Sequence, residues 1–309
     1  MDAGATNVEL IRPYLPRLLL HWIGETPNTP FRELDGTIAF VDISGFTKLS
    51  ERLAKRGKVG AEELTDAIGT CFTRLLAIAY GNGGSLLKFG GDALLMFFSG
   101  AGHAEKAARA AIGMRRELRD IGKMDCSGVP VRLRMSVGVH TGTFHFFLVG
   151  ESHRELIITG PAASETVLME STAEAGEIVV SPTTAAQLPP NVVGAAKGPG
   201  FLLRREPTGI APERPEPEPR IDDREILRYV PGAVRDQLLG GTKDAEHRRV
   251  TIAFIHFDGM DELLNEEGAF RTSQHLHTLV RDVQQAVDRH EVSFLSSDID
   301  RDGGKIILT

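Results

Sequence analysis

Two stretches decide the fold: GTIAFVDISGFTKLS at residues 36–50 and KFGGDALLMFF at residues 88–98. The first opens with a short apolar run that contains β-branched residues, which predicts a buried strand ending near Ser44. The second places Gly90 and Gly91 between two apolar segments, which predicts a β-hairpin with a tight turn. Together they predict a strand and a hairpin that belong to one sheet.

The remaining patterns extend this arrangement. A helix is expected over residues 47–80 with a break near residues 57–60, and an alanine-rich helix over residues 102–121. The segments VRLRMSVGVHTG and TFHFFLVG predict an antiparallel pair of strands. Further expected elements are a strand at 156–158, a helix through residue 170, a strand at 178–180 and a helix around residues 225–239. The order β-α-β-β-α-β-β predicts an α+β fold of ferredoxin-like type, with an antiparallel-rich sheet and helices.

Composition excludes several classes of protein. Among 309 residues, 41% are hydrophobic and 25% are charged, which is enough apolar material for a sizeable core. The formal net charge of −7 gives no overall attraction to nucleic acid, so no nucleic acid is expected as a partner. No apolar run approaches the ~20 residues of a membrane span, and no secretory signal is visible. Because Cys71 and Cys126 fit neither a metal site nor a disulfide framework, a cytoplasmic protein is expected.

The sequence contains an internal repeat. VTIAFIHFDGMDELL at 250–264 resembles residues 36–50, and RDGGKIILT at 301–309 resembles residues 88–96. The two landmarks lie about fifty residues apart in each case, which predicts a second, partial copy of the same fold. That copy stops within its hairpin strand, so we expect a piece of a longer chain. The predicted organisation is a helical lead-in at 1–34, a first domain at 35–205, a Pro- and charge-rich linker with a helix at 206–249, and a truncated second domain at 250–309.

Two carboxylates indicate a metal site in the first copy. Asp42 ends the first strand and Asp92 sits in the hairpin turn, so neighbouring strands would bring both to one edge of the sheet. Oxygen ligands of this kind suit Mg²⁺. The helix that opens after Asp42 offers free N–H groups to a phosphate, and Gly91 lets the backbone approach a ligand closely. The alternatives are a helix-capping role for Asp42 and an ordinary turn role for Asp92.

Three motifs resemble the class III nucleotidyl cyclase catalytic domain: D-I-S-G-F-T from Asp42, K-F-G-G-D-A-L-L from Lys88, and V-G-V-H-T-G from Val137. The resemblance is nearest to the soluble adenylyl cyclase type, which carries two unequal cyclase domains in tandem. It implies conversion of ATP, or GTP, to a cyclic nucleotide and pyrophosphate with two Mg²⁺ (or Mn²⁺) ions. The implied metal ligands are Asp42, Asp92 and the carbonyl of Ile43, and the implied nucleotide-contacting residues are Ser44, Gly45, Phe46, Thr47, Gly91 and Lys88.

The sequence also departs from this family. The family's transition-state Asn and Arg match Ser164 and Leu168, which cannot stabilise phosphoryl charge, so a homodimer of the first copy is expected to be inactive. In the second copy, His256 matches Asp42 and Lys305 matches Asp92, so that copy is expected to lack a metal pair. Lys88 resembles a bicarbonate-binding lysine, but its arginine partner matches Val167, so bicarbonate is not expected. Arg301 falls at the position that reads the base, which leaves ATP versus GTP open.

The leading interpretation is therefore an adenylyl cyclase region in which the two cyclase-like domains pair within one chain. Residues 1–309 alone are expected to bind metal and nucleotide with little turnover. The alternative is a non-catalytic cyclase-like module that binds nucleotide or a partner and regulates an attached effector. A diguanylate cyclase ranks lower, because Ala93 replaces that family's second acidic residue.

Overall fold

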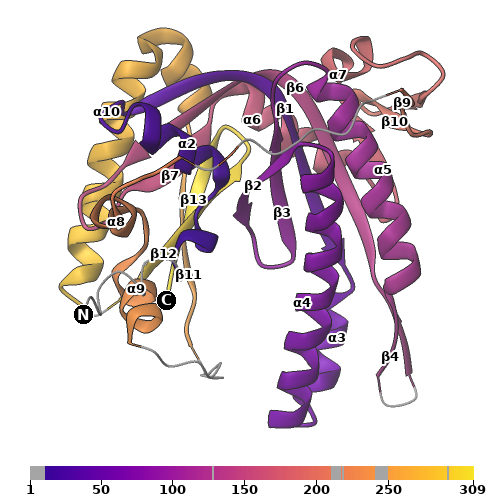
Figure 1. The fold of residues 1–309 in the computed structure, drawn as a ribbon, viewed down its shortest axis with the longest axis horizontal. Helices are drawn as coiled ribbons and strands as arrows, with labels where there is room; N and C mark the ends of the chain where they lie inside the picture. The colour runs from indigo at the N-terminus through magenta and orange to yellow at the C-terminus, as the bar shows by residue number, and fades with distance from the viewer. Residues whose placement is uncertain (1–10, 127–128, 210–216, 218, 241–249, 291) are drawn as a thin grey trace. The chain divides into compact units, whose positions relative to one another are not determined.

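The computed structural model describes the chain apart from residues 1–10, 127–128, 210–216, 218, 241–249 and 291 (Figure 1). The chain divides into two compact units, and each is described by itself. Unit 1 comprises Met1–Leu34, Thr143–Ser164 and Pro217–Thr309, and unit 2 comprises Asp35–Gly142 and Glu165–Glu216. Residues 143–164, which lie inside the predicted first domain, thus cluster with residues 217–309.

One eight-stranded sheet has the order β2-β3-β1-β6-β8-β10-β9, with β7 paired to β6. Strands β1 and β3 are antiparallel, with Thr37 opposite Phe98 and Asp42 opposite Ala93. This confirms the antiparallel-rich α+β fold. The strands are β1 (Phe31–Ser44), β2 (Gly84–Phe89), β3 (Ala93–Phe98), β6 (Arg134–Val149), β7 (Glu155–Thr159), β8 (Ile178–Val180), β9 (Val193–Lys197) and β10 (Gly200–Leu203).

The helices of unit 2 bury their apolar faces against the sheet. Leu75 of α4, Ala107 of α5 and Met96 of β3 are fully buried in one shared core. Figure 1 shows α4 beside α3 and α5. The predicted break in the first helical segment is confirmed, since α3 ends at Ala54 and α4 begins at Lys58. The helices are α2 (Arg17–Glu25), α3 (Phe46–Ala54), α4 (Lys58–Gly81), α5 (His103–Ile121), α6 (Pro161–Thr172) and α7 (Pro182–Ala186), with the short 3₁₀ helix η1 (Arg12–Tyr14).

The strand pattern after α5 differs from the prediction. The expected antiparallel pair is instead one 16-residue strand, β6, because the backbone stays extended through Gly142 and forms no turn. Its first half pairs in parallel with β8, at Val137–Val139, and its second half pairs with β7, at His145–Val149. The hairpins β4 (Lys123–Cys126) with β5 (Val129–Arg132), and β9 with β10, were not predicted.

Unit 1 contains a second strand–helix–hairpin arrangement. Strand β11 (Ala253–Phe257) leads into helix α10 (Met260–Asp288), which is interrupted at Gly268, and then into β12 (Phe294–Asp300) and β13 (Gly303–Leu308). The three strands form an antiparallel sheet of order β11-β13-β12. The same order of elements is seen in β1, α3–α4, β2 and β3. The predicted linker helix is divided at Pro231 into α8 (Asp223–Ile226), the 3₁₀ helix η2 (Leu227–Tyr229) and α9 (Gly232–Leu239).

The hairpin of β6 and β7 forms one core with the C-terminal sheet and helix of unit 1. Phe147 and Ile157 pack in the same buried cluster as Leu276, Val280 and Ile306. Burial of such side chains stabilises a fold by roughly 1.5–3 kcal/mol each. The hairpin, although distant in sequence, is therefore an integral part of this unit. Among the residues that the structure describes, no helix is long and apolar enough to cross a membrane.

Candidate active site

The backbone of unit 2 brings Asp42 and Asp92 to the same edge of the sheet. Asp42 lies near the end of β1, opposite Ala93, and Asp92 immediately precedes Ala93 in the hairpin turn. The N–H of Ile43 donates to the carbonyl of Asp92 at 3.1 Å, so the two segments are hydrogen-bonded next to the carboxylates. This is the juxtaposition that the sequence predicted from residues about fifty positions apart.

The electrostatics at this edge are those of two mutually repelling carboxylates. Both side chains are partly exposed. Burial raises the pKa of Asp42 above its ordinary value, and the negative charge of Asp92 raises this pKa further. A divalent cation placed between the two would relieve the repulsion, and carboxylate and carbonyl oxygens are its preferred ligands. The residues present therefore fit a Mg²⁺ or Mn²⁺ site. In the described part of the chain, no group of three or more His, Cys, Asp or Glu side chains could hold a metal, so such a site depends on backbone, water or substrate oxygens as well.

The helix that follows β1 begins at a glycine in the left-handed region. Gly45 has a φ of +106° and is the N-cap residue of α3, so Asp42 is not the cap. A Cβ at Gly45 would also lie 3.2 Å from the carbonyl oxygen of Arg132. The Phe46 side chain is buried and packs against Phe72, so only its backbone can face a ligand. Thr47 is exposed in the first turn of the helix.

The other predicted nucleotide-contacting residues lie nearby on the same edge. The hydroxyl of Ser44 donates to the carbonyl of Arg134 at 3.4 Å. Gly91 has a φ of +77° in the turn, and no atom within 4 Å would meet an added Cβ, so its role is conformational. Lys88 is half-buried and lies on β2 opposite Leu95, directly after a register shift.

One carboxylate near the site was missed by the sequence interpretation. Glu170 on α6 accepts a hydrogen bond from the hydroxyl of Ser136 at 3.0 Å. Burial raises the pKa of Glu170; the Ser136 hydrogen bond lowers it, and the charge of Asp42 raises it. A Cβ at Gly138 would overlap the backbone of Glu170, so α6 lies directly on β6 at this point. Gly138, the first glycine of V-G-V-H-T-G, was the signal in the sequence for this close approach.

Ser164, the residue matched to the family's transition-state Asn, lies four residues after a glycine that precedes a helix. Gly160 has a φ of +103°, and α6 begins at the next residue. The hydroxyl of Ser164 accepts a hydrogen bond from the N–H of Asp302 at 2.8 Å, within unit 1. Ser164 also donates to the carboxylate of Asp261, whose pKa is nevertheless raised overall by burial. The hydroxyl of Ser164 is therefore bound to other residues of unit 1.

The predicted correspondence of Lys305 with Asp92 is wrong in the hairpin. The β12–β13 turn consists of Arg301 and Asp302, and the pairing of His256 with Lys305 matches that of Asp42 with Ala93, so Lys305 takes the register position of Ala93 and not that of Asp92. Lys305 instead lies within β13, opposite His256, and its Nζ is 3.2 Å from Oδ2 of the buried Asp298. The reason is packing: a Cβ at Gly303 would overlap the carbonyl oxygen of Phe257, so this glycine lies in the strand.

Comparison with known proteins agrees with this geometry. Residues 32–199, more than half of the chain, match the adenylate and guanylate cyclase catalytic domain. The chain belongs to this family. It is 26% identical over 178 residues to human adenylate cyclase type 10, and 28% identical over 186 residues to the membrane guanylyl cyclase of Dictyostelium discoideum. These matches cover 56% and 58% of this chain, but the chain spans only 11% of the length of each relative.

Solved structures show the same fold. The adenylyl cyclase CyaB from P. aeruginosa has a TM-score of 0.50 and 26% identity, and the match covers 59% of this chain and all of CyaB. A bacterial light-regulated adenylyl cyclase has a TM-score of 0.51 at 16% identity, covering 75% of this chain and 66% of that one. Family membership sets aside the diguanylate cyclase alternative. Because the relatives include both adenylyl and guanylyl cyclases, family membership does not decide between an adenine and a guanine nucleotide as substrate.

Proposed function

We propose that this chain is the catalytic region of a nucleotidyl cyclase that converts ATP to cyclic AMP and pyrophosphate. The observation that carries the proposal is the placement of Asp42 and Asp92 side by side at one sheet edge, in a member of the cyclase family. ATP is favoured over GTP because both the human relative and CyaB are named adenylate or adenylyl cyclases.

In this reaction the ribose 3′-hydroxyl loses its proton to water and its oxygen forms a bond to the α-phosphorus, while the bond from that phosphorus to the bridging oxygen breaks and pyrophosphate leaves. Two Mg²⁺ or Mn²⁺ ions, when bound, supply charge neutralisation and activation of the hydroxyl. Asp42, Asp92 and the carbonyl of Ile43 would hold them. The N-terminus of α3 would offer backbone N–H groups to the phosphates, and the open turn at Gly91 would leave room for the nucleotide.

The complementary half of the site is proposed to come from the second cyclase-like copy. Two observations within unit 1 support this pairing. Residues 253–308 repeat the strand–helix–hairpin order of the first copy, and they share a buried core with the β6–β7 hairpin. His256 lies three residues before the N-cap glycine of α10, as Asp42 does before that of α3, so the second copy contributes no equivalent of Asp42.

Residues 1–309 are proposed to turn over slowly by themselves. Ser164 stands where the resemblance implies an amide that contacts the reacting nucleotide, and its hydroxyl is bonded to Asp261 and Asp302. Leu168 offers no charge to the phosphates. The same observations favour the second candidate function, a cyclase-like module that binds nucleotide without converting it and regulates an attached effector.

The test measures binding and turnover together. The 309-residue chain is incubated with Mn²⁺ and either ATP or GTP, and both nucleotide affinity and cyclic nucleotide are quantified. Asp92→Ala is compared with Asp66→Ala, which changes an exposed aspartate on α4. Cyclic AMP that Asp92→Ala abolishes and Asp66→Ala preserves supports the cyclase. Metal-dependent binding without any product supports the regulatory module, and product insensitive to Asp92→Ala overturns the proposal.

A further inference from the structure

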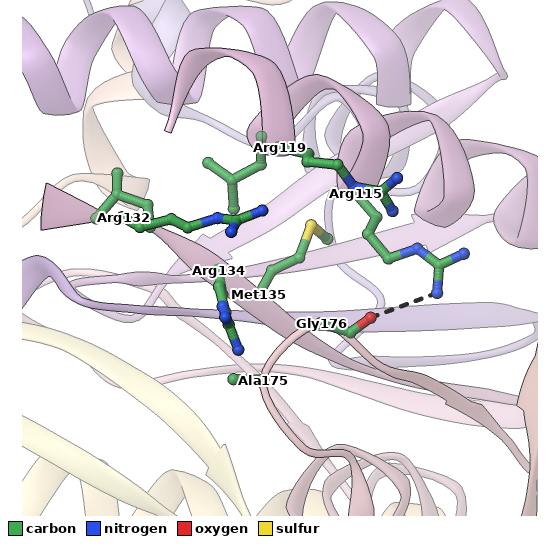
Figure 2. A pocket seen from close by; sticks show the side chains of 9 residues that line it. Arg115, Arg119, Arg132, Arg134, Met135, Ala175 and Gly176 are labelled. Atoms are coloured by element: carbon green, nitrogen blue, oxygen red, sulfur yellow. Dashed lines mark hydrogen bonds between the residues drawn. The ribbon is translucent and has the colours of Figure 1, made fainter. Parts of the chain in front are cut away.

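Four arginines surround one pocket of unit 2, here named the arginine pocket (Figure 2). Arg115 and Arg119 come from α5, Arg132 from β5 and Arg134 from β6. Arg115 is half-buried and the other three are exposed. The cavity has a volume of about 200 Å³ and stands out in a chain whose net charge is −7. Its arginines come from three elements, so the fold, and not a local run of sequence, concentrates the charge.

Within the part of the chain that the structure describes, the guanidinium groups of the arginine pocket have no counter-ion. Among the described residues, no carboxylate forms an ion pair with any of the four guanidinium groups. Arg115 donates a 3.4 Å hydrogen bond to the carbonyl of Gly176, drawn in Figure 2. Burial, followed by the charges of Arg119 and Arg116, lowers the pKa of Arg115. Uncompensated repulsion of this kind is relieved by a bound anion.

An adjoining pocket provides the contrast. It is lined by Arg116, Arg204 and Arg205 together with Glu206, and shares Arg115 and Arg119. There the carboxylate of Glu206 pairs with Arg116 at 2.8 Å and with Arg109 at 3.6 Å. Among the residues that the structure describes, a carboxylate therefore neutralises arginines in the adjoining pocket and none does so in the arginine pocket.

We propose that the arginine pocket binds a polyphosphate anion, such as pyrophosphate or tripolyphosphate. Guanidinium groups bind phosphate oxygens in pairs, and four of them match a ligand with several negative charges better than a monovalent anion. The uncharged lining consists of Leu118, Leu133, Met135, Ala175 and Gly176, with no aromatic ring. A nucleobase would find no stacking partner there, so the phosphate chain is the recognised group.

The backbone connects this pocket to the segment that follows Asp42. The carbonyl of Arg134 accepts a hydrogen bond from the hydroxyl of Ser44, and Gly45 packs against the carbonyl of Arg132. An anion that holds Arg132 and Arg134 in place therefore also restrains the N-terminus of α3. This binding is separate from the proposed metal site, because it requires neither Asp42 nor Asp92.

The experiment titrates tripolyphosphate and pyrophosphate into the 309-residue chain by calorimetry, with EDTA present and nucleotide absent. The double variant R119Q/R134Q is expected to weaken affinity at least tenfold. The matched variant R204Q/R205Q, which removes two exposed arginines from the adjoining pocket, and Asp92→Ala are both expected to keep affinity within twofold. Amide hydrogen exchange at residues 44–49 is expected to slow on binding in the unmodified chain. Thermal unfolding of each variant verifies that it is folded.

Three results would overturn the proposal, two of which concern the pocket itself. One is equal weakening in R119Q/R134Q and R204Q/R205Q, which indicates a general response to charge. The other is the absence of polyphosphate binding by the unmodified chain, including the case in which a glutamate-rich peptide binds instead. Loss of binding only in Asp92→Ala would likewise place the anion at the aspartates and not in the arginine pocket. Because metal is excluded, failure of the cyclase proposal leaves this test unaffected.

Discussion

The carboxylate of Glu155, on β7, accepts hydrogen bonds from both the N–H and the hydroxyl of Ser297, on β12, at 2.8 and 2.7 Å. Both residues are buried, and 142 positions separate them. A buried carboxylate is tolerated only where donors replace its lost water. This pair therefore fixes the β6–β7 hairpin on the C-terminal sheet of unit 1, the contact that we propose as the pairing of the two copies.

Gln284 on α10 makes a second such connection. Its side-chain oxygen accepts from the N–H of Glu151 at 2.7 Å, and its nitrogen donates to the carbonyl of His153 at 2.9 Å. Gln284→Ala is expected to lower the free energy of unfolding by about 2–4 kcal/mol, because it leaves the buried carbonyl of His153 and the part-buried N–H of Glu151 unpaired. Gln285→Ala, at the exposed neighbour, should change it by less than about 0.5 kcal/mol. Denaturant unfolding checks both, and equal effects would contradict the role of Gln284.

Lys305 allows a direct test, because the sequence repeat aligns it with Asp92 whereas the structure places it within β13, opposite His256. Lys305→Asp places a second carboxylate next to the buried Asp298, so we expect a loss of about 3–5 kcal/mol in unfolding free energy. We expect no gain in Mn²⁺ affinity, since residue 305 is not in the turn. Lys305→Met, which keeps the aliphatic volume, measures the loss of the pair alone. New Mn²⁺ binding in Lys305→Asp would show that the correspondence with Asp92 holds after all.

Burial of the His140 side chain makes the free energy of unfolding depend on pH. Burial lowers its pKa from 6.5 to about 4, so the folded chain keeps this imidazole neutral while the unfolded chain protonates it below pH 6.5. Stability is therefore lost as the pH falls from about 6.5 to 4, by up to about 1.4 kcal/mol per pH unit from this group. His140→Gln is expected to flatten that slope in urea unfolding, whereas His290→Gln, at an exposed position, should leave it unchanged.

Asp42 is expected to show a conflict between function and stability. Its pKa is raised in the folded chain, so its ionised form opposes folding, and this cost appears as the pH rises above about 4. Without metal at pH 7, Asp42→Asn should stabilise the chain by about 0.5–2 kcal/mol, with no gain at pH 3. Thermal unfolding at the two pH values measures this. A destabilised variant at pH 7 would indicate that Asp42 is held by favourable structural contacts.

Much of the fold was predictable because it depends on short-range patterns. The strand before Ser44 and the hairpin turn at Gly91 carry local signals. The hairpin then supplies β3, which pairs with β1. The single strand β6 was missed because Gly142 reads as a turn in sequence, while β7 and β8 hold it extended. The position of Lys305 was missed for a related reason: a repeated Gly-Gly suggests the same turn, but contact with Phe257 requires one of these glycines in the strand. Glu170 and the arginine pocket depend on packing between distant elements, which no local pattern reports.

The most direct test of the central claim is the Mn²⁺-dependent affinity of the 309-residue chain for ATP, measured by calorimetry for the unmodified chain, Asp42→Ala, Asp92→Ala and the exposed control Asp66→Ala. We predict that ATP binds with Mn²⁺ and loses at least about tenfold in affinity, or 1.4 kcal/mol, in either site variant, while the control binds normally. Unchanged affinity in both Asp42→Ala and Asp92→Ala would contradict the assignment of these two residues as the metal site.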